Sequence, residues 1–192
     1  MPHAVKIISD KVLSDNWGTL HNVEFEHQLP DGTSHTEVRE VYDRGNGAVI
    51  LLYNTDKRSV ILTRQLRLAT WFNGNADGMM TEACAGKLDE DEPEECIRRE
   101  TEEETGYTLS EVKKVMEVYM SPGSVTEILY FFIAEYNEAM KTGEGGGLDT
   151  ENENIEVLEM PFEEALEMIT TGKINDAKTI ILLQYIRMHG IL

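Results

Sequence analysis

One acidic segment, residues 93–106 with the sequence "PEECIRRETEEETG", constrains the fold more than any other part of the chain. Pro93 suits the first turn of an α-helix, and Gly106 ends it. Two glutamates favour the positive N-terminal end of the helix dipole: Glu94 and Glu95. The pattern predicts one helix over the whole segment, with Asp91 or Glu92 as its N-cap.

The second half of this helix carries four more glutamates, at the end where the backbone carbonyls already make the field negative: Glu100, Glu102, Glu103 and Glu104. Steps of 100° per residue put three of them on the side of the apolar Cys96 and Ile97, whereas Glu102 falls on the opposite side. Glu100 and Glu104, with Cβ atoms about 5–6 Å apart, repel by roughly 3 kcal/mol at an effective dielectric of 20. These inward-facing carboxylates therefore need a counter-charge.

A metal ion supplies this charge better than the neighbouring Arg99, because one guanidinium cannot neutralise three carboxylates and the terminal carbonyls. Oxygen ligands without histidine favour Mg²⁺ or Mn²⁺ over zinc, and none of the five histidines lies in this region. A metal held by few carboxylates keeps open positions for water and phosphate oxygens. This arrangement is typical of phosphoryl and nucleotidyl transfer.

The composition bounds the class of protein. The 192 residues, of which 41% are apolar, suffice for one large domain or for a domain with a small appendage. A net charge of −19 argues against a nucleic-acid partner, because the protein would repel phosphate. The sequence contains neither an apolar run of about 20 residues nor a secretion signal, so we expect a cytoplasmic protein that does not enter a membrane. In a reducing compartment, Cys84 and Cys96 are expected to be small core residues.

Two hairpins are expected before the acidic helix. "HNVEFEHQL" and "HTEVREVYDRG" alternate apolar and polar residues around the turn signal "PDGT". "AVILLYN" and "SVILTRQLR" predict a second, more deeply buried hairpin. The change from half-buried to buried strands predicts a small antiparallel N-terminal β unit, residues 1–46, and a main domain, residues 47–192.

The rest of the main domain mixes strands and helices. A short strand is expected near residues 82–85, and three strands follow the acidic helix: "KKVMEVYM", "EILYFFIAEY" and "IEVLEM". "PFEEALEMITTG" and "DAKTIILLQYIRMHG" predict helices ended by glycine. The pattern predicts an α/β fold with a mixed β-sheet between helices.

The segment "RETEEETGY", residues 99–107, resembles the second half of the Nudix box, R-E-x-x-E-E-x-G followed by an apolar residue. The preceding loop from Gly86 is one residue shorter than usual, which leaves Asp91 and Glu92 as alternatives for the first glutamate of the box. Further stretches resemble the GDP-mannose pyrophosphatase branch of the family: "LSDNW", "REVYDRGNGA", "CAG", "SPGSVTE", "EGGGL" and "NDAKT".

The resemblance implies a Nudix fold and Mg²⁺-dependent hydrolysis of GDP-mannose to GMP and mannose 1-phosphate, with Mn²⁺ as a possible substitute. Two alternatives stay open: an ADP-ribose or ADP-sugar pyrophosphatase of the same family, and a noncatalytic nucleotide-sugar-binding module. The intact carboxylates argue against the second alternative.

The resemblance also assigns the metal ligands and the catalytic residues. The implied metal ligands are the main-chain carbonyl of Ala85 and three glutamates: Glu100, Glu104 and Glu153. Glu153, with Glu151 as an alternative, is expected to orient or deprotonate the attacking water. Glu103, as a secondary ligand, and Arg99 complete the catalytic set.

The implied substrate contacts are Trp17, Arg39, Glu40, Arg67, Gly86, Lys87, Glu127 and Lys178. The cations Arg67 and Lys178 suit diphosphate oxygens. Trp17 stands where the family has a tyrosine, so it can stack on guanine but lacks the phenol hydroxyl. The N-terminal unit is too small to bury a core alone, and the resemblance implies a homodimer in which this unit is swapped or shared. Arg39 and Glu40, like Trp17, are then expected to act across the interface.

Overall fold

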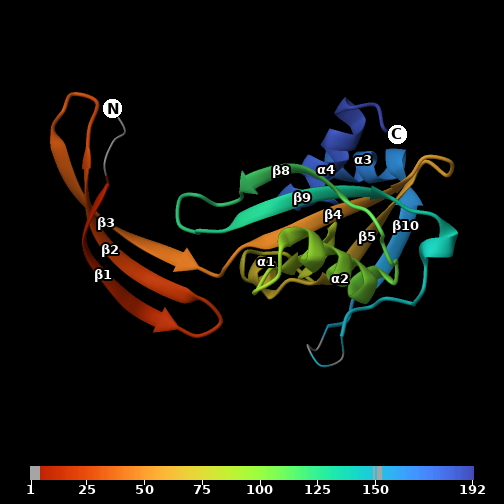
Figure 1. The fold of residues 1–192 in the computed structure, drawn as a ribbon, viewed down its shortest axis with the longest axis horizontal. Coiled ribbons are helices and arrows are strands. Elements are labelled where there is room, and N and C mark those ends of the chain that lie inside the picture. The colour runs from red at the N-terminus through yellow and green to blue at the C-terminus, as the bar shows by residue number, and fades with distance from the viewer. Residues whose placement is uncertain (1–4, 149, 151–152) are drawn as a thin grey trace. The chain divides into compact units, whose positions relative to one another are not determined.

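The computed structural model describes residues 5–148, 150 and 153–192, and the chain divides into two compact units (Figure 1). Unit 1 comprises Met1–Asn46 together with Tyr119–Ile128. Unit 2 comprises Gly47–Val118 together with Leu129–Leu192.

Unit 1 contains a three-stranded antiparallel sheet in the order β1-β2-β3: β1 (Lys6–Asp15), β2 (Thr19–Gln28) and β3 (Ser34–Asp43). The β2–β3 hairpin is the first predicted hairpin. The sequence did not predict β1, because two irregularities, between Ile7 and Ser9 and between Val12 and Ser14, interrupt its alternation.

A segment from the middle of the chain completes unit 1. The N–H of Tyr42 donates to the carbonyl of Ser124 at 2.7 Å, and the N–H of Thr126 donates to the carbonyl of Tyr42 at 3.1 Å. Residues 119–128 therefore join this unit although they follow more than 70 residues of unit 2. The division into functional domains at residues 46 and 47 stays a prediction.

Unit 2 is built on a mixed sheet of seven strands: β4 (Gly47–Asn54), β5 (Ser59–Leu66), β6 (Met79–Glu82), β7 (Cys84–Lys87), β8 (Lys113–Tyr119), β9 (Ile128–Glu135) and β10 (Glu156–Pro161). Five strands follow the order β10-β5-β4-β9-β8, while β6 pairs with β5 and β7 with β4. The β4–β9 pair is parallel, and the β4–β5 pair is antiparallel. Where the sequence predicted one short strand, the chain forms β6 and β7, which Ala83 separates.

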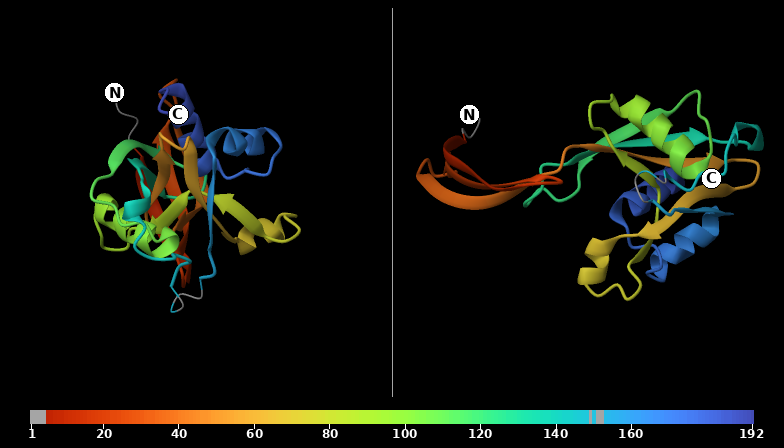
Figure 2. Two further views of the ribbon diagram at one scale, coloured as in Figure 1. Left: turned by 90° about the vertical axis from the view of Figure 1, so that its right-hand side faces the viewer. Right: turned by 90° about the horizontal axis from the view of Figure 1, so that it is seen from below.

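The described residues of unit 2 contain four α-helices: α1 (Leu68–Phe72), α2 (Pro93–Thr105), α3 (Phe162–Thr170) and α4 (Ala177–Met188). Figure 2 shows α2 on one side of the sheet and α3 and α4 on the other. Both α2 and α4 contact β4, whose residues Ala48–Leu52 are buried because the helices cover both faces of the strand. The predicted α/β fold with a mixed sheet between helices is confirmed; the short α1 and a 3₁₀ turn at Glu138–Met140 were not predicted.

Cys84 and Cys96 are free thiols buried in the core between α2 and the sheet, as predicted. Burial raises the pKa of Cys96 to about 12, so this thiol is kept protonated. Among the described residues, no helix is long and apolar enough to cross a membrane.

Candidate active site

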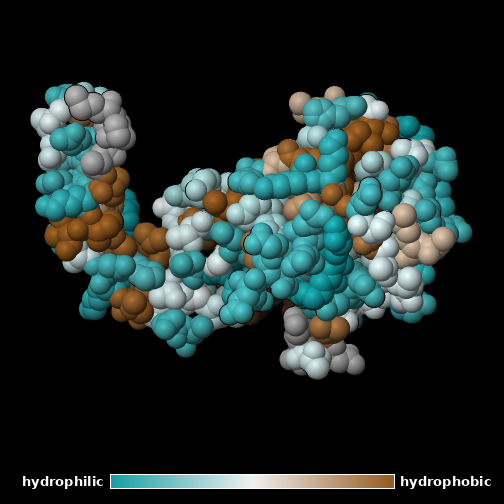
Figure 3. All heavy atoms as spheres, viewed as in Figure 1, coloured by the Kyte–Doolittle hydropathy of each residue, from teal (hydrophilic) through white to brown (hydrophobic). Residues whose placement is uncertain are grey.

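Helix α2 has the predicted bounds, and its outer face is hydrophilic (Figure 3). Glu92 is the N-cap residue, but its side chain makes no capping hydrogen bond. Gly106 ends the helix in the left-handed conformation with φ 76°, as its position predicted. Glu102 is exposed, also as predicted.

The glycine-rich loop after Thr142 satisfies the carbonyl groups at the C-terminal end of α2. The N–H of Gly146 donates to the carbonyl of Glu104 at 2.8 Å, and the N–H of Gly147 donates to the carbonyl of Glu103 at 3.0 Å. Both glycines have positive φ, and a Cβ on Gly147 would lie 2.5 Å from a carboxylate oxygen of Glu153. The loop that carries Glu153 is therefore attached directly to the acidic helix.

Two carboxylates of α2 have strongly perturbed pKa values. The pKa of Glu104 is raised to about 7, chiefly by burial; the charges of Glu100 and Glu153 add to the rise, and Cys84 and Arg67 oppose it. Burial also raises the pKa of Glu100 to about 7, where Arg99 opposes the shift and Glu103 and Glu153 add to it. The shared influence of Glu153 places its charge within range of both carboxylates.

Gly86 in β7 allows Glu100 to approach the sheet. A Cβ on Gly86 would lie 2.1 Å from Cδ of Glu100 and 2.4 Å from its Oε1. Strand β7 pairs with β4 through Val49 and Ala85, so the backbone next to this contact is fixed in the sheet. The predicted carbonyl ligand, Ala85, is thus adjacent to the point where Glu100 meets the strand.

Arg99 forms ion pairs with this group. Its Nη1 lies 3.0 Å from Oε1 of Glu100 and 3.0 Å from Oε2 of Glu103. Its Nη2 lies 3.3 Å from Oδ2 of Asp91. Asp91 and Glu92 were the two alternatives for the first glutamate of the Nudix box. Asp91 contacts Arg99, whereas Glu92 is the N-cap residue of α2 and its side chain makes no capping hydrogen bond.

Glu153 is held by the loop itself, because its Oε2 accepts a hydrogen bond from the N–H of Leu148 at 3.3 Å. The alternative, Glu151, lies outside the described residues.

Glu82, which no sequence pattern singled out, binds both predicted diphosphate-contacting cations. Its side chain is 5% exposed; Oε2 accepts from Nε of Arg67 at 2.6 Å, and Oε1 accepts from Nζ of Lys178 at 2.5 Å. Lys178 also contacts Asp176, the N-cap residue of α4, at 3.0 Å. A carboxylate within the buried stretch "MTEACAG" was the available signal, because such groups are almost never buried unpaired.

The remaining predicted substrate contacts are divided between the two units. In unit 2, Lys87 lies 3.4 Å from Asp89. In unit 1, Arg44 lies 4.9 Å from the ring centroid of Trp17 and 3.4 Å from Oε1 of Glu127. The last two predicted substrate-contacting residues, Arg39 and Glu40, are exposed on β3. Arg39 pairs with Glu37 on the same strand.

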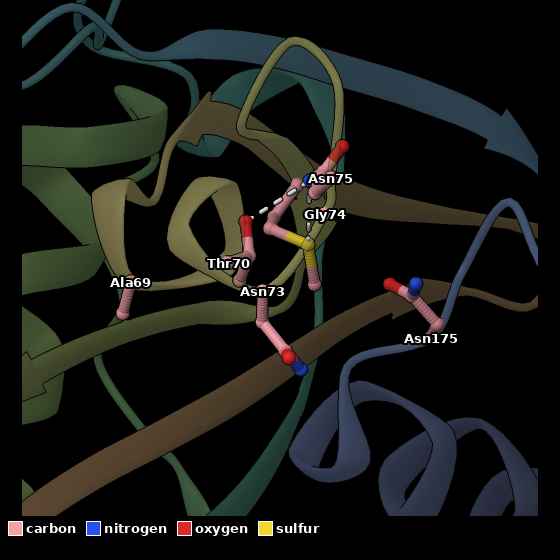
Figure 4. Close-up of a pocket in the computed structure, with 7 residues that line it drawn as sticks. Ala69, Thr70, Asn73, Gly74, Asn75 and Asn175 are labelled. Atoms are coloured by element: carbon pink, nitrogen blue, oxygen red, sulfur yellow. Dashed lines mark hydrogen bonds between the residues drawn. The ribbon is translucent and has the colours of Figure 1, made fainter.

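A cavity of about 530 Å³ lies beside α1 in unit 2 (Figure 4). Its lining contains no charged side chain: Ala69, Thr70, Asn73, Gly74, Asn75, Met80 and Asn175. Asn75 is fixed by hydrogen bonds to Oγ1 of Thr70 at 3.0 Å and to the carbonyl of Met79 at 3.1 Å. The cavity offers hydrogen bonds but no charge, so it suits a neutral polar group better than a phosphate.

The residues at the end of α2 fit a hard divalent cation. Oε2 of Glu104 is buried without a hydrogen-bond partner, and a bound cation would satisfy this oxygen. A bound cation would also lower the raised pKa values of Glu100 and Glu104, because a positive charge favours the ionised form of a carboxylate. The described side chains at this end of the helix offer oxygen donors and no imidazole, which matches Mg²⁺ or Mn²⁺.

Comparisons with known proteins identify the class. The profile of the NUDIX domain matches residues 43–183, and that of the GDP-mannose pyrophosphatase NudK N-terminal domain matches residues 4–42. The chain belongs to the Nudix family, whose members generally depend on a divalent metal ion.

Within this family, the chain belongs with relatives named GDP-mannose pyrophosphatase. It is 56% identical to such a protein of Shigella flexneri over 192 residues, which cover 100% of both chains. It is 57% identical to one of Enterobacter over 188 residues, covering 98% of this chain and 97% of the relative. A solved structure described as an ADP compounds hydrolase shares the fold, with a TM-score of 0.72, 16% identity, and coverage of 98% of this chain and 97% of that one.

The contact between Gly86 and Glu100 can be tested by Gly86→Ala. The added methyl group displaces the Glu100 carboxylate, so we expect kcat to fall on the order of 100-fold, as for other small misplacements of catalytic groups. Gly143→Ala is the matched control, because its nearest neighbour would lie 3.9 Å away. Steady-state kinetics and thermal unfolding of both variants measure the effect; equal kcat values for the two variants would show that the close approach is unimportant.

The raised pKa of Glu104 predicts a pH-dependent stability. Because the folded-state pKa of about 7 exceeds the ordinary 4.5, the metal-free folded protein binds more protons than the unfolded chain, and its free energy of unfolding falls as pH rises from about 5 to 8. Glu104→Gln removes this penalty, so at pH 8 in chelator the variant is expected to be more stable by about 1–3 kcal/mol.

Mg²⁺ is expected to stabilise the wild type but not Glu104→Gln, in urea unfolding with and without the ion. The exposed Glu102→Gln is the control and should behave as the wild type. A Glu104→Gln protein that is destabilised in chelator, or that gains as much from Mg²⁺ as the wild type, contradicts the assignment.

Proposed function

We propose that this protein hydrolyses the diphosphate bond of GDP-mannose in the presence of Mg²⁺, giving GMP and mannose 1-phosphate. The observation that carries the proposal is the full-length similarity to GDP-mannose pyrophosphatases, combined with the buried, partnerless carboxylate oxygen of Glu104. A purely nucleotide-sugar-binding module would not need to bury such a group, which costs stability unless it binds a cation.

The proposed metal ligands are Glu100, Glu104 and the main-chain carbonyl of Ala85, with Glu153 from the glycine-rich loop. Glu103 is assigned a secondary, water-mediated role, and Arg99 pairs with the carboxylates of both Glu100 and Glu103 at 3.0 Å. A bound Mg²⁺ would lower the pKa of a water molecule and neutralise the charge that develops on the leaving phosphate. Mn²⁺ is expected to substitute, since it prefers the same oxygen ligands.

Glu153 is the proposed general base. Glu104 lies buried and Glu100 partly buried on α2, whereas Glu153 lies on a loop that is anchored to α2 by two main-chain hydrogen bonds, from Gly146 and Gly147. This attachment supports the proposal, because it holds the loop that carries Glu153 against the end of α2. A positioned carboxylate of this kind can orient the attacking water and accept its proton.

Arg67, Lys178, Lys87 and the backbone at Gly86 are proposed to contact the diphosphate. The Nε of Arg67 is engaged by Glu82, which leaves its two terminal nitrogens available for phosphate oxygens. Lys178 has one donor beyond those used by Glu82 and Asp176. Glu82 therefore fixes the direction from which both cations meet the substrate. In unit 1, Trp17, Arg39, Glu40 and Glu127 are proposed to read the nucleoside.

We also propose that the chain is a cytoplasmic homodimer formed through unit 1. None of residues 5–46 is buried, and Figure 3 shows hydrophobic residues gathered on this sheet. The exposed apolar side chains include Val5, Ile7, Ile8, Val12, Leu13 and Val38. A single-layer sheet cannot bury these groups alone. Light scattering of the full chain tests the proposal, and a monomer at micromolar concentration contradicts it.

The proposed reaction is tested by a substrate panel. With Mg²⁺ we expect release of GMP from GDP-mannose, with a higher kcat/KM than for ADP-ribose or ADP-glucose. Glu100→Gln should lower kcat on the order of 100-fold or more at saturating Mg²⁺, because the charge-stabilising cation is lost. A higher kcat/KM for an ADP compound would instead favour the ADP-sugar alternative, and unchanged turnover in Glu100→Gln would refute the metal site.

The role of Glu82 predicts a split between kcat and KM. Glu82→Gln leaves both cations in place but removes the carboxylate that orients them, so we expect kcat to fall about 10- to 100-fold, the range for one charged hydrogen bond, with a smaller change in KM. Glu82→Asp keeps the charge but is too short to reach both partners, so it should fail to rescue kcat.

The matched control is Glu159→Gln. Glu159 on β10 likewise binds a lysine, Lys57, at 3.0 Å and also accepts from Tyr136 at 2.8 Å. Its loss should change stability but leave kcat within about twofold. Wild-type kcat in Glu82→Asp would show that charge compensation, and not positioning, is the function of Glu82.

A further inference from the structure

The N-terminal sheet carries a group of metal-ligating side chains that the proposed reaction does not use. His27 on β2 lies directly opposite His35 on β3, and Glu37 lies two residues further along β3, on the same face as His35. One nitrogen of each histidine and one carboxylate oxygen lie within 4.8 Å of one another. This His27–His35–Glu37 cluster belongs entirely to unit 1.

The separations within the cluster match a tetrahedral metal site. Oε1 of Glu37 lies 3.2 Å from Nε2 of His27 and 3.3 Å from Nδ1 of His35. Zinc binds nitrogen and oxygen ligands at about 2.0–2.1 Å, so the ligand atoms of a tetrahedral site lie about 3.3 Å apart. The protein thus already holds two of the three ligand pairs near the required distance.

The carboxylate of Glu37 directs one oxygen, Oε1, toward the two histidines. Arg39 pairs with Oε2 of Glu37, the oxygen that makes neither histidine contact, and leaves Oε1 to the two imidazoles. The side chain of His35 is 58% exposed, so solvent can reach the cluster and occupy a fourth position. His27 and Glu37 are more buried, at 27% and 21% exposure, which limits their movement.

We propose that the His27–His35–Glu37 cluster is a binding site for a first-row transition-metal ion, with Zn²⁺ as the expected occupant. Two imidazoles and one carboxylate form a ligand set that zinc prefers, whereas Mg²⁺ prefers oxygen ligands alone. The two cations would therefore occupy different sites on the same chain. Because the ligands come from neighbouring strands, the ion would fasten the end of the β2–β3 hairpin.

A second histidine–carboxylate pair on the same sheet provides the matched control. Nδ1 of His21 lies 2.8 Å from Oδ1 of Asp10, a contact that resembles those of the cluster in its chemistry. The described residues around this pair supply no third ligand within the same distance. If zinc simply bound surface histidines, it would bind at both the His21–Asp10 pair and the His27–His35–Glu37 cluster. If the cluster is a specific site, zinc binds only there.

The test is calorimetric titration of Zn²⁺ alone into the full-length, metal-free protein. Glu104→Gln serves as the background, so that the carboxylates of α2 contribute less. We expect one zinc ion to bind in this background, His35→Ala to weaken its binding at least tenfold, and His21→Ala to leave it unchanged. Zn²⁺ should also raise the thermal unfolding temperature of the background protein more than that of His35→Ala.

Equal zinc affinity in the background protein and in His35→Ala would overturn the proposal, and so would an equal loss in His21→Ala. Should His35→Ala alter the hairpin, Glu37→Gln supplies the same test, because it preserves the shape of the side chain and removes the anionic ligand. The titration does not depend on turnover, so it stands whether or not GDP-mannose is the substrate.

Discussion

The attachment of the acidic end of α2 to strand β7 and to the glycine-rich loop is the constraint on which the site depends. Gly86 lets the Glu100 carboxylate lie against the strand where no Cβ could fit. The N–H groups of Gly146 and Gly147 satisfy the last carbonyls of the helix and bring Glu153 to the same place. Three distant parts of the chain thereby meet at one centre, where the carboxylates repel one another.

This repulsion explains the electrostatics of the centre. Burial and mutual repulsion raise the pKa values of Glu100 and Glu104 to about 7, although Arg99 and Arg67 oppose the shifts. A site that is complementary to a divalent cation is necessarily unfavourable without it, because the same carboxylates that bind the ion repel one another in its absence. The stable sheet of unit 2, with β4 buried under helices on both faces, supports this unfavourable group.

Much of the fold could be predicted from local patterns. The alternation in β2 and β3, the apolar runs of β4 and β5, and the Pro93 and Gly106 signals of α2 each depend on residues close in sequence. Strand β1 was not predicted because bulges disturb its alternation of apolar and polar residues. Helix α1 was not predicted because its five residues are too few to show a helical period. Residues 119–128 join unit 1 through hydrogen bonds to Tyr42, which no local pattern reveals.

The sequence alone determined which acidic side chains share one face of α2: helical spacing puts Glu100, Glu103 and Glu104 on the side of the apolar residues, because helix geometry fixes which side chains lie together. Only the tertiary structure decided which groups surround that face. Glu82 reads as an ordinary strand residue until folding places Arg67 and Lys178 on its two oxygens. His27 and His35 likewise become a pair only through the register of β2 and β3. Such contacts join residues that are distant along the chain, so packing and strand pairing decide them and sequence periodicity does not.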